Sequence, residues 1–202
     1  MHTFPRTLLA TALVLAGGLA HADDWFVRAG AAHVSPKSNN GSLAGGALHV
    51  DIDSDTQLGL ILGYHFTPNI AVELLAATPF SHTVSLNGAR AVDFKHLPPT
   101  LSLQYYFAPD GQVNPFVGLG VNYTWTYSER ETGPVAGASV GLGNSWGLAA
   151  QAGLVFKVSD RWDVVAEARW IDIDADVKLN GAKIGTANVD PLVYGLYLGY
   201  RF

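Results

Sequence analysis

Nine residues from Trp162 to Trp170, W-D-V-V-A-E-A-R-W, decide the fold. Successive side chains of a β-strand point to opposite faces. One face of this stretch is apolar, and Asp163, Glu167 and Arg169 fall on the other face. A tilted strand crosses a bilayer in about 9–11 residues, and tryptophans are typical of the two bilayer interfaces. The stretch therefore predicts a transmembrane β-strand.

The same alternation recurs along the chain. It occupies eight segments, at about 25–34, 54–66, 69–79, 96–107, 114–127, 145–157, 161–172 and 187–202. Long connections near 35–53, 80–95, 128–144 and 173–186 alternate with short, turn-rich ones. Long and short connections alternate when one rim of a barrel carries loops and the other carries tight turns. The sequence predicts an all-β protein, an eight-stranded antiparallel up-and-down transmembrane β-barrel.

The face opposite the apolar one supports this interpretation. It is rich in glycine and small polar residues, which suit a narrow barrel interior better than a solvated surface. All five tryptophans share the apolar parity and lie near segment ends. Five tryptophans at two depths indicate aromatic girdles at two bilayer interfaces.

Composition excludes several other classes of protein. Of the 202 residues 49% are hydrophobic and 14% charged, against about 25% charged in soluble domains. The net charge of −5 argues against a nucleic-acid partner, which would need a basic face. The chain has no cysteine, so disulfides and thiolate metal sites are excluded. No apolar run reaches the roughly 18 residues of a membrane-spanning helix.

The N-terminus reads as a signal peptide. Arg6 precedes the apolar stretch 8–16, and Ala20-His21-Ala22 offers an A-x-A cleavage site. We expect a signal peptide over residues 1–22, cleavage near Ala22, and an outer-membrane barrel domain over residues 23–202.

Several blocks of sequence carry a family resemblance. They are W-F-V-R-A-G at 25–30, N-I-A-V-E-L-L-A-A-T-P-F at 69–80, H-L-P-P-T-L at 96–101, P-F-V-G-L-G-V-N-Y-T at 115–124, S-W-G-L at 145–148 and the closing G-Y-R-F at 199–202. In these blocks the chain resembles the OmpW family of small outer-membrane proteins. The resemblance implies a barrel in the Gram-negative outer membrane that passes small hydrophobic molecules, as the related AlkL-type alkane importers do. It also implies that Phe202, with Tyr200 and Leu198, is an assembly signal for the barrel-insertion machinery.

The predicted interior divides into two parts. Near the short turns and around the middle of the barrel, the residues whose parity points inward are polar. We expect them to pair as a plug, because an isolated charge in the interior is costly. They are Arg28, Glu73, Gln104, Gln151, Glu167 and Arg169. Nearer the long loops inward parity gives an apolar cup, lined by Val34, Ile61, Leu75, Pro98, Ile171 and Val193. Inward glycines either leave room for a ligand or relieve strain; they include Gly59, Gly118, Gly120, Gly147 and Gly153.

The sequence-based hypothesis is passive uptake of small hydrophobic molecules, which enter the cup and leave sideways into the lipid. Proline cannot donate ladder hydrogen bonds, so Pro79, Pro98 and Pro99 indicate a weakened wall or a plain strand end. The rival hypothesis is a non-conducting surface barrel whose loops act as receptor or adhesion sites. The loops near 35–53 and 128–144 depart most from the family, which puts a receptor role in doubt.

Enzymatic and metal chemistry find little support in the sequence. Ser81 and His82, with Asp93 and His96 further along, offer the groups of a nucleophilic site, but adjacent strand residues face opposite ways. The alternate aspartates at 51–55 and 172–176 read as solvated charge runs more readily than as calcium sites. We predict no catalytic, cofactor-binding or metal residues. The expected partners are outer-membrane lipid and lipopolysaccharide, small hydrophobic ligands and the insertion machinery, with no nucleic acid, for a monomeric barrel.

Overall fold

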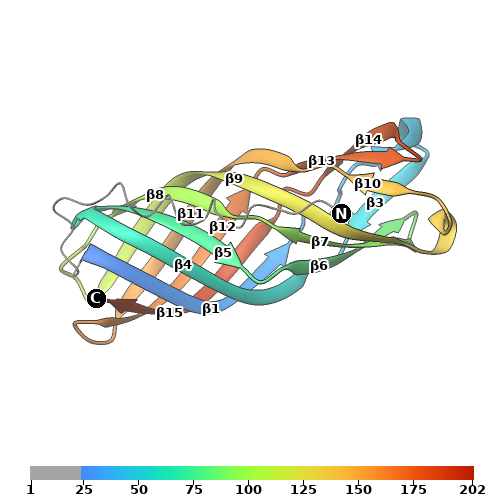
Figure 1. Cartoon of the computed structure of the whole chain (residues 1–202). Coiled ribbons are helices and arrows are strands. Elements are labelled where there is room, and N and C mark those ends of the chain that lie inside the picture. The colour runs from blue at the N-terminus through green and yellow to red at the C-terminus, as the bar shows by residue number, and fades with distance from the viewer. Residues whose placement is uncertain (1–23) are drawn as a thin grey trace, which may run out of the picture.

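The computed structural model describes residues 24–202, which form one elongated β-structure (Figure 1). Neighbouring strands of the barrel pair antiparallel in the order β11-β12-β15-β1-β4-β5-β8-β9, and β9 pairs back with β11 to close the ring. The bounds of these strands are β1 (Trp25–Ser35), β4 (Asp55–Thr67), β5 (Ile70–Ala77), β8 (Thr100–Tyr106), β9 (Val113–Glu131), β11 (Ser145–Lys157), β12 (Trp162–Ile171) and β15 (Leu192–Arg201). The predicted eight-stranded barrel is confirmed. The predicted signal peptide, residues 1–22, lies outside the described residues.

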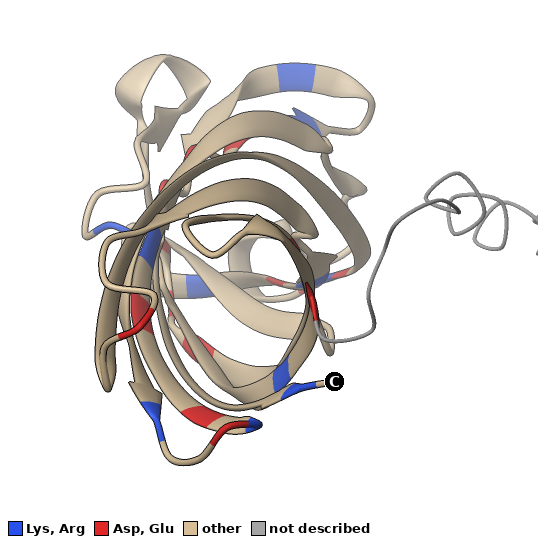
Figure 2. Ribbon diagram, turned by 90° about the vertical axis from the view of Figure 1, so that its left-hand side faces the viewer, with Lys and Arg blue, Asp and Glu red and all other residues tan. Residues whose placement is uncertain are grey.

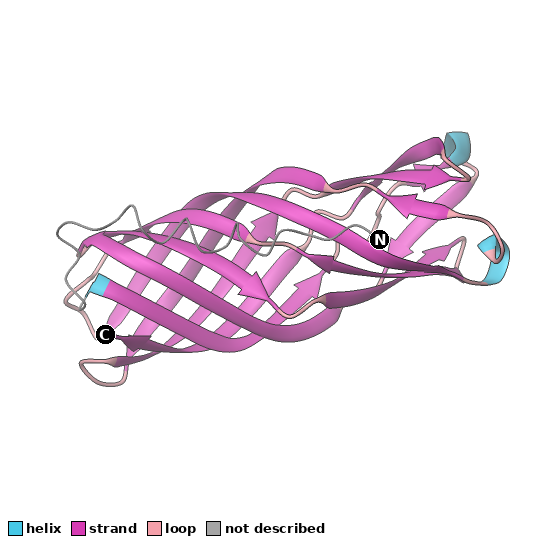
Figure 3. Ribbon diagram, in the orientation of Figure 1, coloured by secondary structure: helices cyan, strands magenta, loops and turns pink. Residues whose placement is uncertain are grey.

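The long connections are not the loops that the sequence suggested. They carry strands that continue the barrel wall beyond the ring, at the end opposite the C-terminus (Figure 3). We call this part the outer extension. It contains β2 (Ser42–Leu43), β3 (Leu48–Ile52), β6 (Phe80–Leu86), β7 (Ala89–Leu97), β10 (Val140–Leu142), β13 (Asp174–Leu179) and β14 (Ala182–Asn188), the 3-10 turns η2 (Ala44–Gly46) and η3 (Gly133–Val135), and the far end of β9.

Two Asn-Gly turns explain the extra strands. Asn87 and Gly88 join β6 to β7 with φ values of 49° and 80°, and Asn180 and Gly181 join β13 to β14 with φ values of 50° and 84°. Two successive residues with positive φ form the tight turn that matches the twist of a hairpin, and Asn-Gly is its preferred sequence. This signal was present in the sequence and was missed.

The predicted strand 96–107 is also corrected. β7 ends at Leu97 and β8 begins at Thr100, so Pro98 and Pro99 separate two strands. Both strands pair with β9 on one side, but on the other side β7 pairs with β6 and β8 pairs with β5. Neither Pro98 nor Pro99 can donate a backbone hydrogen bond, and the strand therefore breaks at this point.

The barrel exterior is apolar between two aromatic rings. Leucines and valines of the wall are exposed, with Leu119 at 72% and Leu148 at 64% of their surface. At the short-turn rim Trp162 packs on Tyr200 with ring centroids 4.9 Å apart, and at the other rim Tyr123 packs on Trp146 at 4.7 Å. Such a band with two girdles fits a bilayer. Figure 2, viewed from the short-turn end, shows the closed ring and how sparse charged residues are on its wall.

The closing residues follow the same alternation. Leu198 and Phe202 are about half exposed, and Tyr200 packs edge-on against Phe202 with ring centroids 5.4 Å apart. All three lie on the outer face of the last strand or its end. Their role as an assembly signal stays a prediction. No helix among residues 24–202 is both long and apolar enough to cross a membrane.

Inward glycines make room for aromatic rings of neighbouring strands. Gly63 lies opposite Phe26, and Gly153 lies opposite Phe116. A Cβ at Gly63 would lie 2.0 Å from the Phe26 ring, and one at Gly153 would lie 2.6 Å from the Phe116 ring. An aromatic side chain that covers a glycine on the adjacent strand is a known device of curved sheets. At these two positions the space belongs to the protein and not to a ligand.

We predict that Gly153→Ala destabilises the barrel by about 1–3 kcal/mol, the usual effect of overpacking. The added methyl would also lie 2.7 Å from the Ala166 carbonyl oxygen, which is backbone and cannot swing away. Urea unfolding of the protein refolded in lipid vesicles measures the change. Ala152→Val is the matched control, since Ala152 is exposed on the outer face, and it should leave the free energy of unfolding nearly unchanged. Equal stability of Gly153→Ala and the parent would contradict this packing.

Candidate functional site

Glu73 of β5 is the centre of a buried ionic network in the barrel interior. Its carboxylate accepts hydrogen bonds from Arg169 Nη2 at 2.5 Å and from Gln151 Nε2 at 3.1 Å, both to Oε1. Its Oε2 accepts from Arg28 Nη1 at 3.4 Å. These four side chains come from four strands and are at most 6% exposed. Three donors on one carboxylate compensate for the loss of its hydration.

Further contacts extend the network across the lumen. Arg169 Nη2 also donates to Glu167 Oε1 at 3.1 Å, so two arginines face two glutamates. Arg28 donates to the Tyr106 hydroxyl at 3.2 Å, and that hydroxyl donates to Gln104 Oε1 at 2.7 Å. The structure thus brings together all six residues that the sequence assigned to a polar plug, in one connected and charge-balanced cluster.

Bulky side chains fill the lumen around this cluster. One apolar cluster contains Phe26, Phe116 and Tyr197, which are each 1% exposed, together with Ile61 and Leu75. Sequence reasoning did not single out these rings. Their signal was a large side chain on inward parity opposite, or next to, a glycine on the adjacent strand.

The residues assigned to the apolar cup occupy two layers. Val34, Ile171 and Val193 lie together in a cluster that continues to Phe80, Ile173 and Val189 of the outer extension. Ile61 and Leu75 lie lower, with Ile61 directly opposite Arg28 in the β1–β4 register. Pro98 is buried at the wall. The upper layer, and not the whole set, therefore forms the apolar layer above the ionic network.

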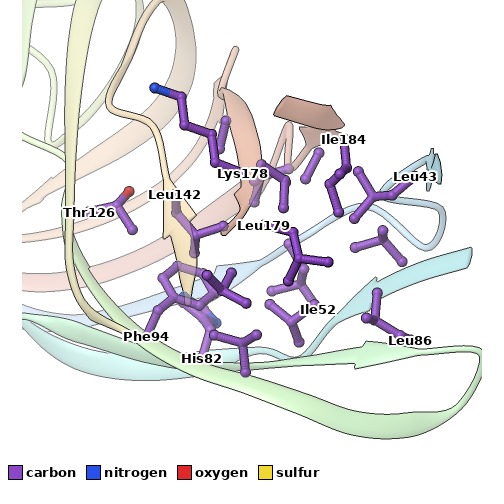
Figure 4. Close-up of a pocket in the computed structure, with 18 of the residues that line it drawn as sticks. Leu43, Ile52, His82, Leu86, Phe94, Thr126, Leu142, Lys178, Leu179 and Ile184 are labelled. Carbon is purple, nitrogen blue, oxygen red and sulfur yellow. The ribbon is translucent and has the colours of Figure 1, made fainter. Parts of the chain in front are cut away.

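An apolar cavity of about 70 Å³ lies in the outer extension (Figure 4). One water molecule needs about 10–15 Å³ on the same scale. The walls come from β2, β3, β6, β7, β9, β10, β13, β14 and η3, with Leu43, Val50, Leu86 and Phe94 among the lining residues. Ile52, Ile173 and Val189 contribute both to this cavity and to the upper layer of the cup. The cavity was not found from the sequence because its walls come from segments taken to be loops.

His82 and His96 lie between the cavity and the upper cup. Their Nε2 atoms are 3.0 Å apart, and His82 Nδ1 lies 2.7 Å from the Asp53 carbonyl oxygen. The carbonyl only accepts, so His82 carries its proton on Nδ1 and its Nε2 accepts from His96 Nε2. The rings of Phe80 and Phe94 flank the pair, at 5.5 Å from His96 and 5.6 Å from His82 respectively.

The candidate catalytic group is not assembled around these histidines. Both nitrogens of His82 are occupied by Asp53 and His96, while Ser81 is exposed on the opposite face of β6. Asp93 accepts hydrogen bonds from Arg90 and Thr83 on that outer face. The structure therefore separates the hydroxyl from the base.

The aspartates at 172–176 do not form one group either. Asp172 and Asp174 group with Asp190, their carboxylate oxygens within 4.8 Å of one another, whereas Asp176 pairs with Lys183 at 2.6 Å. Asp190 also accepts from Lys37 at 2.7 Å.

The barrel wall has a break beside the cup. The β5–β8 ladder ends at the pair Leu75 and Thr100, and the β6–β7 ladder starts at the pair Phe80 and His96. Within the described chain, no backbone hydrogen bond joins residues 76–79 to residues 97–99. The other side of this segment is closed, because Asn122 Nδ2 donates to the carbonyl oxygens of Pro98 and Pro99 at 3.0 and 3.1 Å.

Comparison with known proteins identifies relatives over nearly the whole chain. A family model described as the OmpW family matches residues 21–202. Outer membrane protein W of Salmonella typhimurium is 39% identical over the full length of both chains. Outer membrane protein AlkL of Ectopseudomonas oleovorans is 28% identical, over 80% of this chain and 74% of the relative. The crystal structure of OprG from Pseudomonas aeruginosa superposes with a TM-score of 0.78 at 35% identity, covering 89% of this chain and 96% of that one.

Glu73→Leu should destabilise the barrel by about 3–5 kcal/mol, because it leaves Arg28 and Arg169 buried without their shared partner. Denaturant unfolding in lipid vesicles measures the loss. The control, Lys37→Gln, breaks an ion pair that is partly exposed at the rim, where such pairs contribute little. If both variants unfold alike, Glu73 does not organise the interior.

The outer extension should lose stability in acid. His96 lies beyond the outer aromatic ring, and burial, with the neighbouring His82, lowers its pKa to about 3; burial also lowers the pKa of His82. Unfolded histidine has a pKa near 6.5, so stability is constant above that pH and falls as the pH drops toward 3. For His96 alone the loss is roughly 2 kcal/mol at pH 5.

Hydrogen exchange of the β6 and β7 amides at pH 7.5 and pH 5 tests this expectation. The stability loss should be reduced in His96→Phe, which cannot take up the proton. Exchange in β12 and β15, far from the histidines, serves as the internal control. A pH effect of the same size in His96→Phe would contradict the assignment.

Proposed function

Because this chain belongs to the OmpW family, whose members are outer-membrane proteins, we propose that it admits small hydrophobic molecules through the polar surface of the outer membrane and releases them sideways into the lipid. The observation that carries the proposal is the continuity of apolar side chains from the cavity of the outer extension to the packed upper layer of the cup. Ile52, Ile173 and Val189 belong to both regions. An apolar solute that moves from the cavity to the cup therefore stays in contact with apolar side chains on at least one side.

The floor of the cup supports a sideways exit. Below the upper layer lie the ionic network and the rings of Phe26, Phe116 and Tyr197. A solute that continued along the axis would have to break buried ion pairs, each worth about 3–5 kcal/mol when one partner is lost. No comparable penalty opposes movement of an apolar solute into hydrocarbon.

The break in the wall supports the same route. Residues 76–79 and 97–99 face each other without backbone hydrogen bonds between them. Separating the two segments therefore breaks side-chain contacts and no backbone hydrogen bond. The segment begins directly below Phe80, a residue of the upper cup. A small displacement there would connect the cup to lipid while the closed β8–β9 pairing stays intact.

Uptake of p-xylene by cells that produce the protein, compared with cells that lack it, tests the function. We expect faster uptake in producing cells at equal expression of other envelope proteins. Equal rates would favour the alternative of a non-conducting surface barrel whose loops bind a partner.

An engineered disulfide tests the exit. The chain has no cysteine, so Ala76→Cys with Pro99→Cys introduces a single bond across the break, next to the pair Leu75 and Thr100. Oxidation should slow p-xylene uptake at least several-fold, and reduction should restore it. The control pair Ala166→Cys and Leu196→Cys bridges strands that are already paired on the outer face, and its oxidation should leave uptake unchanged. Uptake that is insensitive to the first bond excludes this exit.

A further inference from the structure

A groove on the outward face of the outer extension gathers cationic side chains. It runs over β6, β7 and the far end of β9, which are neighbours in the sheet (Figure 1). Its charged lining residues are three cations, Arg90, Lys95 and Arg130, and a single carboxylate, Asp93. The chain as a whole, by contrast, has a net charge of −5. The groove is therefore a local excess of positive charge on an acidic protein.

Two of the three cations are uncompensated. Arg90 donates two hydrogen bonds to the Asp93 carboxylate, at 3.1 and 2.5 Å, so these two charges cancel. Lys95 and Arg130 are exposed, and neither side chain makes a hydrogen bond or an ion pair with any residue between 24 and 202. An anion that enters the groove therefore meets two cations whose hydrogen-bond donors are not already used by the protein.

A β-bulge in β9 places Arg130 in this groove. The outward positions of β9 alternate as far as Tyr127, and continued alternation would turn Glu129 outward next. Ser128 instead has a φ of 57°, and the register with β7 shifts at this point. A bulge re-aims the side chains that follow it. Glu129 and Glu131 accordingly accept hydrogen bonds from backbone N–H groups of β10, and the outward position goes to Arg130.

The groove lies at the height of lipid head groups. Lys95 is paired with Tyr127 in the β7–β9 register, and the next outward pair toward the barrel is Leu97 and Trp125. Two residues of a strand span about 7 Å. The Trp125 and Tyr127 rings are in contact, with centroids 5.2 Å apart. Because aromatic girdles lie at the head-group level of a bilayer, Lys95 and Arg130 project just above the hydrocarbon.

Lys95 and Arg130 are close enough to bind one anion together. Arg130 is directly opposite Asp93, so Lys95, two residues further along β7, is its diagonal neighbour. Such neighbours are about 7–8 Å apart, within reach of long side chains. Arginine and lysine both bind phosphate through charge-assisted hydrogen bonds. The exposed Ser128 hydroxyl lines the same side of the groove and supplies a further donor.

Two carboxylates limit the site to the β7–β9 side. Asp53 accepts a hydrogen bond from the Thr83 N–H, and Asp55 accepts one from the Ser81 N–H. Both carboxylates therefore flank β6, and neither is among the residues that line the groove. An anion is repelled along the β6 edge and attracted between β7 and β9.

We propose that this groove binds the phosphorylated headgroup of lipopolysaccharide, with Lys95 and Arg130 as the ligands of one phosphate. Lipopolysaccharide is the anionic lipid of the outer leaflet, and the chain belongs to a family of outer-membrane proteins. A phosphate held at Lys95 leaves the acyl chains to run down past Leu97 and Trp125 into the bilayer. The site is independent of the proposed function, because it lies on the outward face and not on the route of a solute.

The test uses lipid A, the phosphorylated membrane anchor of lipopolysaccharide. The full-length mature protein in phosphatidylcholine nanodiscs is titrated with rising mole fractions of phosphorylated lipid A, or of the same lipid without phosphate. Divalent cations are left out, so that no metal bridges a phosphate to a carboxylate. The backbone amide NMR signals of Thr83 and Tyr127 report binding. We expect saturable shifts with the phosphorylated lipid and no saturation with the phosphate-free lipid.

Substitutions at the two cations identify the ligands. Lys95→Gln and Arg130→Gln should each weaken lipid A binding about fivefold, and the double variant about 25-fold, which corresponds to roughly 1 kcal/mol for each cation. The control, Lys37→Gln with Lys183→Gln, removes the same charge from ion pairs outside the groove. It should leave the affinity nearly unchanged.

Three results would overturn the proposal. Equal shifts with phosphate-free lipid A would show that the phosphate is not recognised. An equal loss of affinity in the control variant would show that only the net charge matters. Saturation of the same signals by inorganic phosphate, as tightly as by lipid A, would show an anion site with no preference for a lipid. Each of these results leaves the uptake of p-xylene to its own assay.

Discussion

A chain that crosses hydrocarbon must bond every backbone N–H and C=O group to itself, because no water is present to bond them. This constraint shapes the whole molecule. It requires the pairing of β9 with β11 that closes the ring, and closure with eight strands leaves an interior only wide enough for side chains. The interior is accordingly filled by rings such as Phe26 and Tyr197 and by the network around Glu73.

The break at Pro98 and Pro99 is the place where this rule is relaxed, and the structure shows how it persists. Proline supplies no N–H, so fewer donors go unsatisfied when the ladder to residues 76–79 is absent. The two proline carbonyls are instead held by the side-chain amide of Asn122, and Pro99 also accepts from the Tyr123 N–H at 3.1 Å. The wall is thus weakened on one side and anchored on the other.

Alternation alone predicted the ring of strands, because lipid outside and packed side chains inside impose a period of two on every segment such as 162–170. The same parity predicted the residues around Glu73, since a charge on the inner face of a narrow barrel needs a partner. It could not predict the outer extension, where both faces meet water or a small core and the period carries less information. Only the turn residues Asn87-Gly88 and Asn180-Gly181 signalled those hairpins. Nor could parity show depth, which is why Ile61 and Leu75 were grouped with Val34 although they lie in another layer.

The barrel lumen and the outer extension differ in how their side chains are constrained. Within the membrane the lumen is tightly packed, since rings of the next strand cover glycines such as Gly63 and Gly153 and the buried charges pair with one another. Beyond the outer aromatic ring, β9 continues past the bilayer; its 19 residues span roughly 60 Å in extended form. It carries Thr124 and Thr126 into a second, smaller core that no lipid constrains. On the proposed route a solute meets this second core before it reaches the barrel, so the side chains of the outer extension are the ones placed to select what the barrel receives.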